Sequence, residues 1–183
     1  MSDADKLRDA NPWHPITDAI DLKHLGKLAE EAAELGDAVA SRAAMVYGVA
    51  GMHRTSWHAI EHEIADVRAN SELVIARFRL DDRRIAALSQ ARVHAHAGSS
   101  PVLLRLAADA CRLGCAVARC IIQGVDEREP VTGRLNRDWL EQAIADVWGE
   151  SDLTIERCQL DAQRIGARIE HKKHHLKQWH ALA

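Results

Sequence analysis

Aromatic residues, glycine and proline are all scarce in this sequence. Aromatic side chains make up 4% of the 183 residues, and there are only ten glycines and four prolines. Glycine and proline interrupt helices, whereas aromatic residues favour strands, so their scarcity favours helices. Apolar residues, at 47%, are sufficient for a buried core in a chain of this length. The composition therefore predicts an all-α fold.

The sequence also lacks a strong charge of one sign and a long apolar run. The formal net charge is −3, and basic residues are scattered apart from the run at 172–175. We therefore expect no nucleic-acid partner. No apolar stretch approaches the roughly 18 residues of a membrane span, and the first residues lack the apolar core of a signal peptide. We expect no membrane association and a cytoplasmic location.

Cysteine pairs with metal-ligand or redox spacing are absent as well. None of the four cysteines, Cys111, Cys115, Cys120 and Cys158, forms a C-x-x-C pair. In a reducing compartment such residues most often serve as apolar filler, so we expect them to be buried.

An internal repeat organises the chain. At an offset of 80, residues 58–85 and 138–165 are identical at 13 of 28 positions, and at an offset of 78, residues 27–39 and 105–117 are identical at 7 of 13. Both blocks occur in the same order, which indicates two fused copies of one helical unit. The segment AGSSP at 97–101 is the natural junction. The predicted units are therefore 1–97 and 98–183.

Each unit is expected to form a long helix, a loop, a second long helix and a shorter third helix. Asp81 and Asp161 are placed to cap the third helices. Apolar residues recur at helical spacing in both units. In the first they are Leu25, Leu28, Ala32, Leu35 and Val39, then Ile60, Ile64, Val67, Ser71, Ile75 and Phe78. In the second they are Leu106, Leu113 and Val117, then Leu140, Ile144, Val147 and Ile155. Since one helix pair cannot bury its stripe alone, the two units are expected to share a four-helix core.

Two pairs of acids flank these stripes in the first unit. On a helical wheel Glu31 and Glu34 lie together at one edge of the first stripe, whereas Glu30 points toward solvent. Glu63 and Asp66 lie at the edge of the second stripe. If the two helices pack antiparallel, the four carboxylates Glu31, Glu34, Glu63 and Asp66 converge.

Such a cluster needs a counter-charge. Each ionised carboxylate raises the pKa of its neighbours, and burial raises the pKa of every carboxylate in the cluster. Oxygen-only ligands suit Mg²⁺, or alternatively Mn²⁺, and Mg²⁺ in turn binds phosphates. An isolated E-x-x-E on a helix is usually a solvated face, however.

The second unit offers an internal comparison. Glu31 corresponds to Asp109, Glu34 to Arg112 and Glu63 to Ala143, and only Asp66 is kept, as Asp146. The apolar positions persist while the acids are lost, so the helix pair does not need the acids in order to fold.

The text E31-A-A-E34, followed after 28 residues by E63-I-A-D66, resembles the E-x-x-E…E-x-x-D motif of the MazG-like all-α nucleoside triphosphate pyrophosphohydrolases. The flanking text KLAEEAAELGDAV and EIADVRANSELVI agrees. The resemblance covers nearly the whole chain, once in full and once degenerate. It implies hydrolysis of a nucleoside triphosphate, with a deoxynucleotide as the expected substrate, between the α- and β-phosphates. It also implies a pseudo-dimer within one chain with one working site, and allows a homodimer of that chain.

The resemblance also implies roles for particular residues. Glu31, Glu34, Glu63 and Asp66 would hold Mg²⁺, and Glu34 or Glu31 would orient and deprotonate the attacking water. Asn70 could contact the sugar or base. Cations for the phosphates could be Lys27, Arg92 of the first unit, or Lys172 and Lys173 lent by the second unit. Trp13 and His14 could stack on or cap a base.

In a competing interpretation the protein catalyses no reaction. The acids would then be a solvated face on a non-catalytic helical module that binds a nucleotide or a protein partner. A third interpretation is an enzyme that requires a second chain to complete its site. The sequence alone leaves all three open.

Overall fold

A computed structural model of the chain describes residues 13–48, 55–99 and 101–181, the last without side chains beyond residue 178. Six helices occupy these residues, and the prediction of an all-α fold is confirmed. Their bounds are α2 Ala19–Val46, α3 Trp57–Phe78, α4 Asp82–His96, α5 Val102–Gln123, α6 Asn136–Arg157 and α7 Ala162–Ala181. In the same residues the only β pairing is an isolated bridge between Arg128 and Leu135. None of the helices described is both long and apolar enough to cross a membrane.

Short polar side chains set where several helices begin. The carboxylate of Asp18 accepts hydrogen bonds from the backbone N–H groups of the first turn of α2. The Ser56 hydroxyl does the same for α3. As predicted, Asp81 caps α4 and the Asp161 carboxylate accepts from the N–H of Arg164 in α7. Each cap satisfies a backbone donor that the helix itself cannot.

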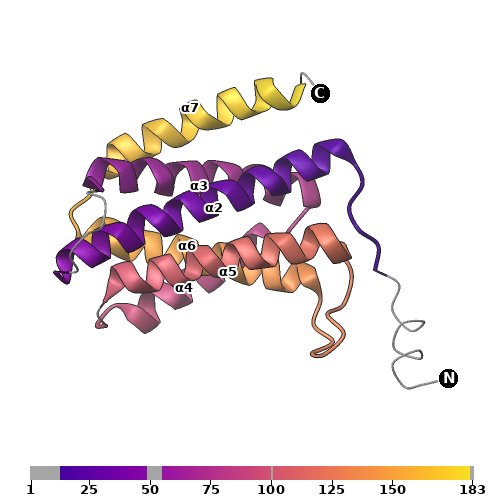
Figure 1. The fold of residues 1–183 in the computed structure, drawn as a ribbon, viewed down its shortest axis with the longest axis horizontal. Coiled ribbons are helices and arrows are strands. Elements are labelled where there is room, and N and C mark those ends of the chain that lie inside the picture. The colour runs from indigo at the N-terminus through magenta and orange to yellow at the C-terminus, as the bar shows by residue number, and fades with distance from the viewer. Residues whose placement is uncertain (1–12, 49–54, 100, 182–183) are drawn as a thin grey trace.

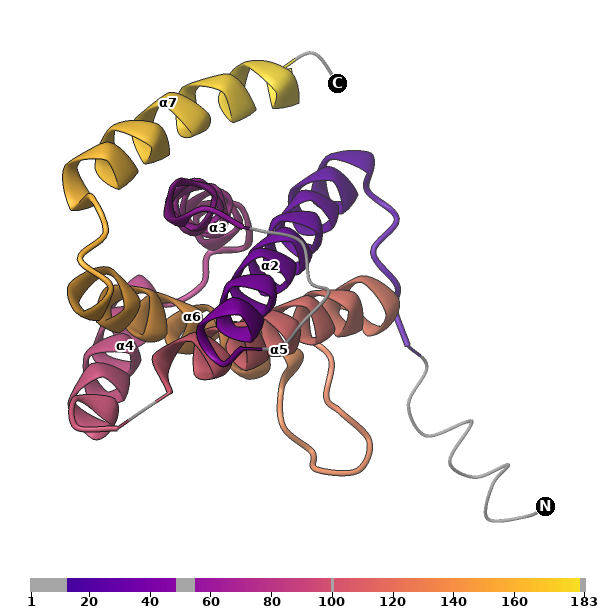
Figure 2. The same ribbon diagram turned by 60° about the vertical axis from the view of Figure 1, so that its left-hand side comes forward.

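Helices of each predicted unit pack against helices of the other. In the middle, α2 packs along α5, with α3 beside α2 and α6 beside α5. The third helices lie on the outside: α4 packs on α6, and α7 packs on α3 (Figures 1 and 2). Each third helix therefore lies against the second helix of the other unit. This arrangement places residues of the second unit beside the acids of the first.

The predicted apolar stripes form the core. In α2 all five predicted residues are fully buried, and in α3 so are Ile60, Ile64, Val67 and Ser71. The predicted residues of α5 and the first three of α6 are also fully buried. The outer ends of the stripes, Ile75, Phe78 and Ile155, are only partly buried.

The prediction of buried cysteines was partly wrong. Cys120 is buried and Cys158 is half-buried, but Cys111 and Cys115 are exposed on α5. The error arose because the apolar stripe of α5 runs through Leu113 and Val117, and residues 111 and 115 lie off that stripe.

Two buried glutamates hold the third helices in place. A carboxylate oxygen of Glu61 in α3 accepts a hydrogen bond of 2.9 Å from the N–H of Asp161, at the start of α7. Glu141 in α6 accepts one of 3.0 Å from the N–H of Asp81, at the start of α4. The second oxygen of each glutamate accepts from an arginine at 2.8 Å, Arg164 and Arg84 respectively. The two contacts match at an offset of 80 residues.

A close approach between α4 and α6 depends on a glycine. A Cβ atom at Gly149 would lie 2.8 Å from the carbonyl oxygen of Ser89 and 2.9 Å from the Cβ of Arg92. Only a residue without a side chain lets α4 pack at this distance.

Candidate functional site

The antiparallel packing of α2 and α3 brings three of the four predicted acids together. Carboxylate oxygens of Glu31, Glu63 and Asp66 all lie within 4.8 Å of one another. Glu31 is 1% exposed and Asp66 is 4% exposed, whereas Glu63 is half-buried. Glu34 is exposed one helical turn after Glu31, at the rim of the cluster.

The positions of these acids follow from the helical period. Glu31 and Asp66 lie next to fully buried apolar residues of α2 and α3, so burial of the stripes carries both carboxylates inward. Glu30, which the wheel places on the outer face, is exposed, and so is Asp37.

The cluster perturbs its own protonation. Burial, and then the charges of Glu34, Asp66 and Glu31, raise the pKa of Glu63 from 4.5 to about 7. The pKa of Glu34 is also raised, first by burial and then by the charge of Glu31 and a hydrogen bond with it. Ionising all four groups at neutral pH is therefore unfavourable without further positive charge.

A lysine from α7 supplies part of that charge. The ammonium group of Lys172 lies 3.0 Å from Glu31 Oε1 and 2.7 Å from Asp66 Oδ2, so it bridges α2 and α3. Burial lowers the pKa of Lys172, but the hydrogen bonds to Asp66 and Glu31 outweigh it and the net pKa is raised. Lys27 adds a second cation, at 2.9 Å from Glu31 Oε1 and 3.0 Å from Glu30. Lys172 is thus a second-unit residue at the first-unit acids.

Arg168 is a site residue that the sequence interpretation missed. Its Nε and one terminal nitrogen donate to the two oxygens of Asp66, at 2.9 and 2.7 Å, in a bidentate pair. The offset of 80 aligns Arg168 with Leu88, so the repeat gave no sign of a cation there. The available signal was its spacing of four residues from Lys172, which places both side chains on one face of α7.

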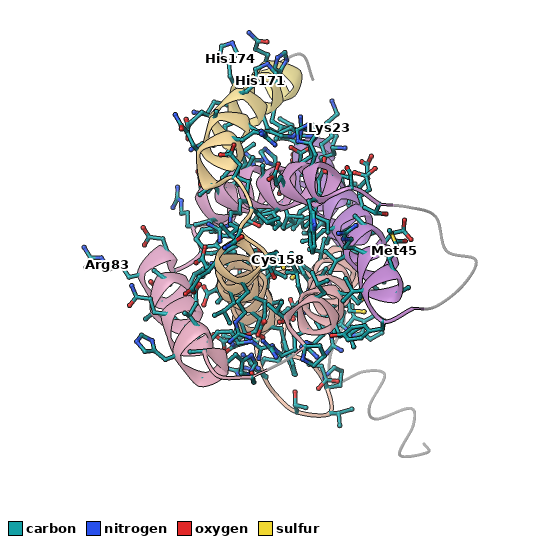
Figure 3. All side chains as sticks on the ribbon, turned by 90° about the vertical axis from the view of Figure 1, so that its left-hand side faces the viewer. Lys23, Met45, Arg83, Cys158, His171 and His174 are labelled. Atoms are coloured by element: carbon teal, nitrogen blue, oxygen red, sulfur yellow. The ribbon has the colours of Figure 1, made fainter. Side chains whose placement is uncertain are left out.

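A pocket adjoins the lysine side of the cluster. It has a volume of about 430 Å³ and is lined by Lys27, Glu30, Lys172, His175 and Leu176. His171 and His174, by contrast, project from the outer side of α7 (Figure 3).

Other predicted site residues lie elsewhere or face inward. Lys173 pairs with Glu72 at 2.5 Å and with Glu170 at 3.1 Å instead of with the four acids. Asn70 is 2% exposed, and its side-chain amide donates to the backbone carbonyl of Asp66 within α3. The side chain of Asn70 is therefore buried and bonded within α3, and it does not face solvent.

The N-terminal segment lies against the loop that follows α5. Trp13 is half exposed, and the His14 ring is 2.7 Å from Glu127 in that loop. The backbone N–H of His14 donates to the backbone carbonyl of Gln123 at the end of α5. These contacts tie His14 to the α5–α6 connection and do not bring it into the acid cluster.

The acids of the second unit also pair with a cation, which the first unit supplies. Arg92 of α4 lies 2.6 Å from Asp109 and 3.9 Å from Asp146, the residues that correspond to Glu31 and Asp66. It also pairs with the fully buried Glu150 at 3.2 Å. Arg92 thus lies against second-unit acids, not the first-unit acids that the sequence interpretation suggested for it.

Comparison of the chain with models of protein families, with curated proteins and with solved structures gives no match.

Proposed function

We propose that this chain is a Mg²⁺-dependent nucleoside triphosphate pyrophosphohydrolase, as its resemblance to the MazG-like family implies. The observation that carries the proposal is the convergence of Glu31, Glu63 and Asp66 from two helices, with ligand oxygens within 4.8 Å of one another. The proposed reaction adds water across the α–β phosphoric anhydride and yields a monophosphate and pyrophosphate.

The residues present fit a hard divalent cation. All the ligand atoms are carboxylate oxygens, which suit Mg²⁺ or Mn²⁺. The Oε2 atom of Glu31 is buried, and the described residues offer it no donor other than the carboxyl of Glu34 when that group is protonated. When bound, Mg²⁺ would supply charge neutralisation at the triphosphate and acidify water. We assign Glu31, Glu63 and Asp66 as its ligands, with Glu34 at the rim.

The chain's own cations suit the phosphates. Lys172 and Lys27 line the pocket beside the acids, so their ammonium groups can exchange carboxylate partners for phosphate oxygens. Arg168 holds Asp66 through two hydrogen bonds and fixes its orientation. Glu34, exposed and with a raised pKa, is placed to accept a proton from the attacking water.

The wider organisation is part of the same proposal. Two MazG-like units, 1–97 and 98–183, would form a pseudo-dimer in which the second unit lends Lys172 and Arg168 to the first. The matching contacts of Glu61 and Glu141 at an offset of 80 support this view. Substrates would be cytoplasmic nucleoside triphosphates, deoxynucleotides above all, and the pseudo-dimer could itself pair into a homodimer.

One observation favours a second candidate, a non-catalytic helical module. Lys172 bridges Glu31 and Asp66 through two short contacts, and at the second-unit acids Arg92 pairs closely with Asp109 and lies 3.9 Å from Asp146. In this alternative the cations are permanent counter-charges that join the helices, and no metal ion binds.

Pyrophosphate release from a panel of deoxynucleoside triphosphates separates the two candidates. We expect Mg²⁺-dependent release by the native chain and its loss in Asp66→Asn and Glu31→Gln. Asp37→Asn, which changes an exposed acid on the same helix as Glu31, is the matched control and should retain activity. Circular dichroism and size-exclusion chromatography establish that each variant is folded.

Mn²⁺ binding, followed by electron paramagnetic resonance, gives an independent measurement. Binding by the native chain that disappears in Asp66→Asn supports the enzyme. Folded native protein that neither binds Mn²⁺ nor releases pyrophosphate from any nucleotide would refute the proposal and leave the non-catalytic module.

A further inference from the structure

A second pocket lies between α5 and α6 in the other unit. It has a volume of about 170 Å³ and is lined by residues spaced at i, i+3, i+4 and i+7 on each helix. They are Arg112, Cys115, Ala116 and Arg119 of α5, with Trp139, Gln142, Ala143 and Asp146 of α6. The pocket thus occupies the groove that corresponds to the acid cluster between α2 and α3.

Two substitutions between the units change the chemistry of this groove. Ala143 stands where the first unit has Glu63, so the space of a long side chain is vacated. Arg112 stands where the first unit has Glu34, so the charge at the rim is reversed. Since this groove has lost acidic side chains and gained a cation, an anion suits it better than a metal ion.

The arginines at the rim keep donors for a ligand. Arg112 is 58% exposed at its side chain and pairs with Asp109, which Arg92 also neutralises. Arg119 lies 3.8 Å from Glu129, beyond hydrogen-bond distance. Because each guanidinium carries five N–H donors, both can bind a phosphate at the mouth of the pocket.

The interior suits a flat ring. Trp139 supplies an aromatic wall, and Cys115, Ala116 and Ala143 are small. The guanidinium groups of Arg134 and Arg119 lie 4.3 and 5.8 Å from the centroid of the Trp139 ring, so cations already contact this wall. A volume of about 170 Å³ lies below the roughly 300 Å³ at which pockets begin to enclose a drug-sized ligand, so a single ring system fits. An aromatic ring that shares the Trp139 ring with these two cations would gain stacking energy.

Asp146 is the one acid that lines this pocket. Its side chain is 16% exposed, accepts a hydrogen bond of 2.9 Å from Gln142 and lies 3.9 Å from Arg92. A carboxylate in the interior repels an anion there but accepts hydrogen bonds from N–H groups at the edge of a ring. The anionic group must therefore stay at the rim, and the ring must carry N–H donors.

We propose that this pocket binds a nucleoside monophosphate without a metal ion, with the base against Trp139 and the phosphate at Arg112 and Arg119. Guanine offers adjacent ring and amino N–H donors to Asp146, so guanosine monophosphate is the best-fitting member of the class. The site is separate from the acid cluster and does not depend on the proposed hydrolase.

Isothermal titration calorimetry of the full chain in excess EDTA tests the site. The probes are the four nucleoside monophosphates, guanosine and inorganic phosphate. We expect one equivalent of guanosine monophosphate to bind. Guanosine, which lacks the phosphate, and inorganic phosphate, which lacks the base, should each bind roughly tenfold more weakly. Arg119→Ala and Arg112→Glu, which restores the first-unit residue, should each weaken binding at least roughly tenfold.

Two further variants place the binding in this pocket. Arg83→Ala removes an arginine that extends from the outer side of α4 (Figure 3) and should leave the affinity unchanged. Asp66→Asn, in the acid cluster, should also leave it unchanged. The proposal is overturned by the absence of binding, by equal binding of phosphate alone, or by native affinity in both Arg112→Glu and Arg119→Ala.

Discussion

Replacing Glu63 by glutamine tests whether the acids form an electrostatically strained cluster. The pKa of Glu63 rises from 4.5 to about 7 through burial and the charges of neighbouring carboxylates, a difference of about 2.5. Since this pKa is raised in the folded chain, the stability that Glu63 contributes is complete below pH 4.5 and is lost as the pH rises through about 7. Glutamine stays neutral and keeps that stability.

The expected gain follows from the size of the pKa change. At about 1.36 kcal/mol per pKa unit the full difference corresponds to roughly 3.4 kcal/mol, and solvent screening of a half-buried group reduces this to on the order of 1–2 kcal/mol. Glu63→Gln should therefore unfold at higher urea concentration than the native chain near pH 8 in EDTA. Near pH 4.5 the two proteins should have similar free energies of unfolding.

The matched control is Glu156→Gln, which changes an exposed glutamate on α6. Its difference from the native chain should stay within about 0.5 kcal/mol across the pH range, as for most surface changes. If Glu63→Gln is destabilised near pH 8, or if its difference from the native chain does not vary with pH, the strained cluster is disproved.

Five further variants, one of them a control, probe the arrangement of the helices and the charge of the site. Glu61→Gln and Glu141→Gln should each lower the free energy of unfolding by about 2 kcal/mol, because each removes the charge of a buried carboxylate that accepts from an arginine and from a backbone N–H. A loss confined to one of them in urea denaturation would contradict the matching roles. Gly149→Ala should lower the free energy of unfolding by about 1–3 kcal/mol, because its Cβ atom would overlap α4. The control Gly26→Ala has open space around its Cβ position and should be neutral or up to about 1 kcal/mol more stable in thermal melts. Lys172→Ala should tighten Mn²⁺ binding by removing a competing cation, and unchanged affinity in a Mn²⁺ titration would show that Lys172 does not compete with the ion.

Much of the fold can be predicted from local sequence patterns. The apolar stripes recur with the helical period, and the caps Asp81 and Asp161 precede their helices directly, so both could be predicted from neighbouring residues. The convergence of Glu31 with Asp66 followed from the same period, because two flanks meet once two stripes pack.

The surroundings of the acids depended on which helix covers which. Glu31 and Asp66 are joined by Lys172 because α7 packs on α3 of the other unit, and Arg168 follows on the same face. A repeat shows that the units are alike but not how their third helices are exchanged. His14 likewise pairs with a loop more than 100 residues away, a contact that no local pattern encodes.

The sequence by itself thus determined the helices, their buried faces and which carboxylates share an edge, because periodicity and capping act over one or two turns. Only the tertiary structure decided the counter-charges of those carboxylates, the raised pKa of Glu63 and the pocket beside Trp139. These properties depend on distances between helices far apart in the chain, and electrostatic energies are set by such distances and by burial.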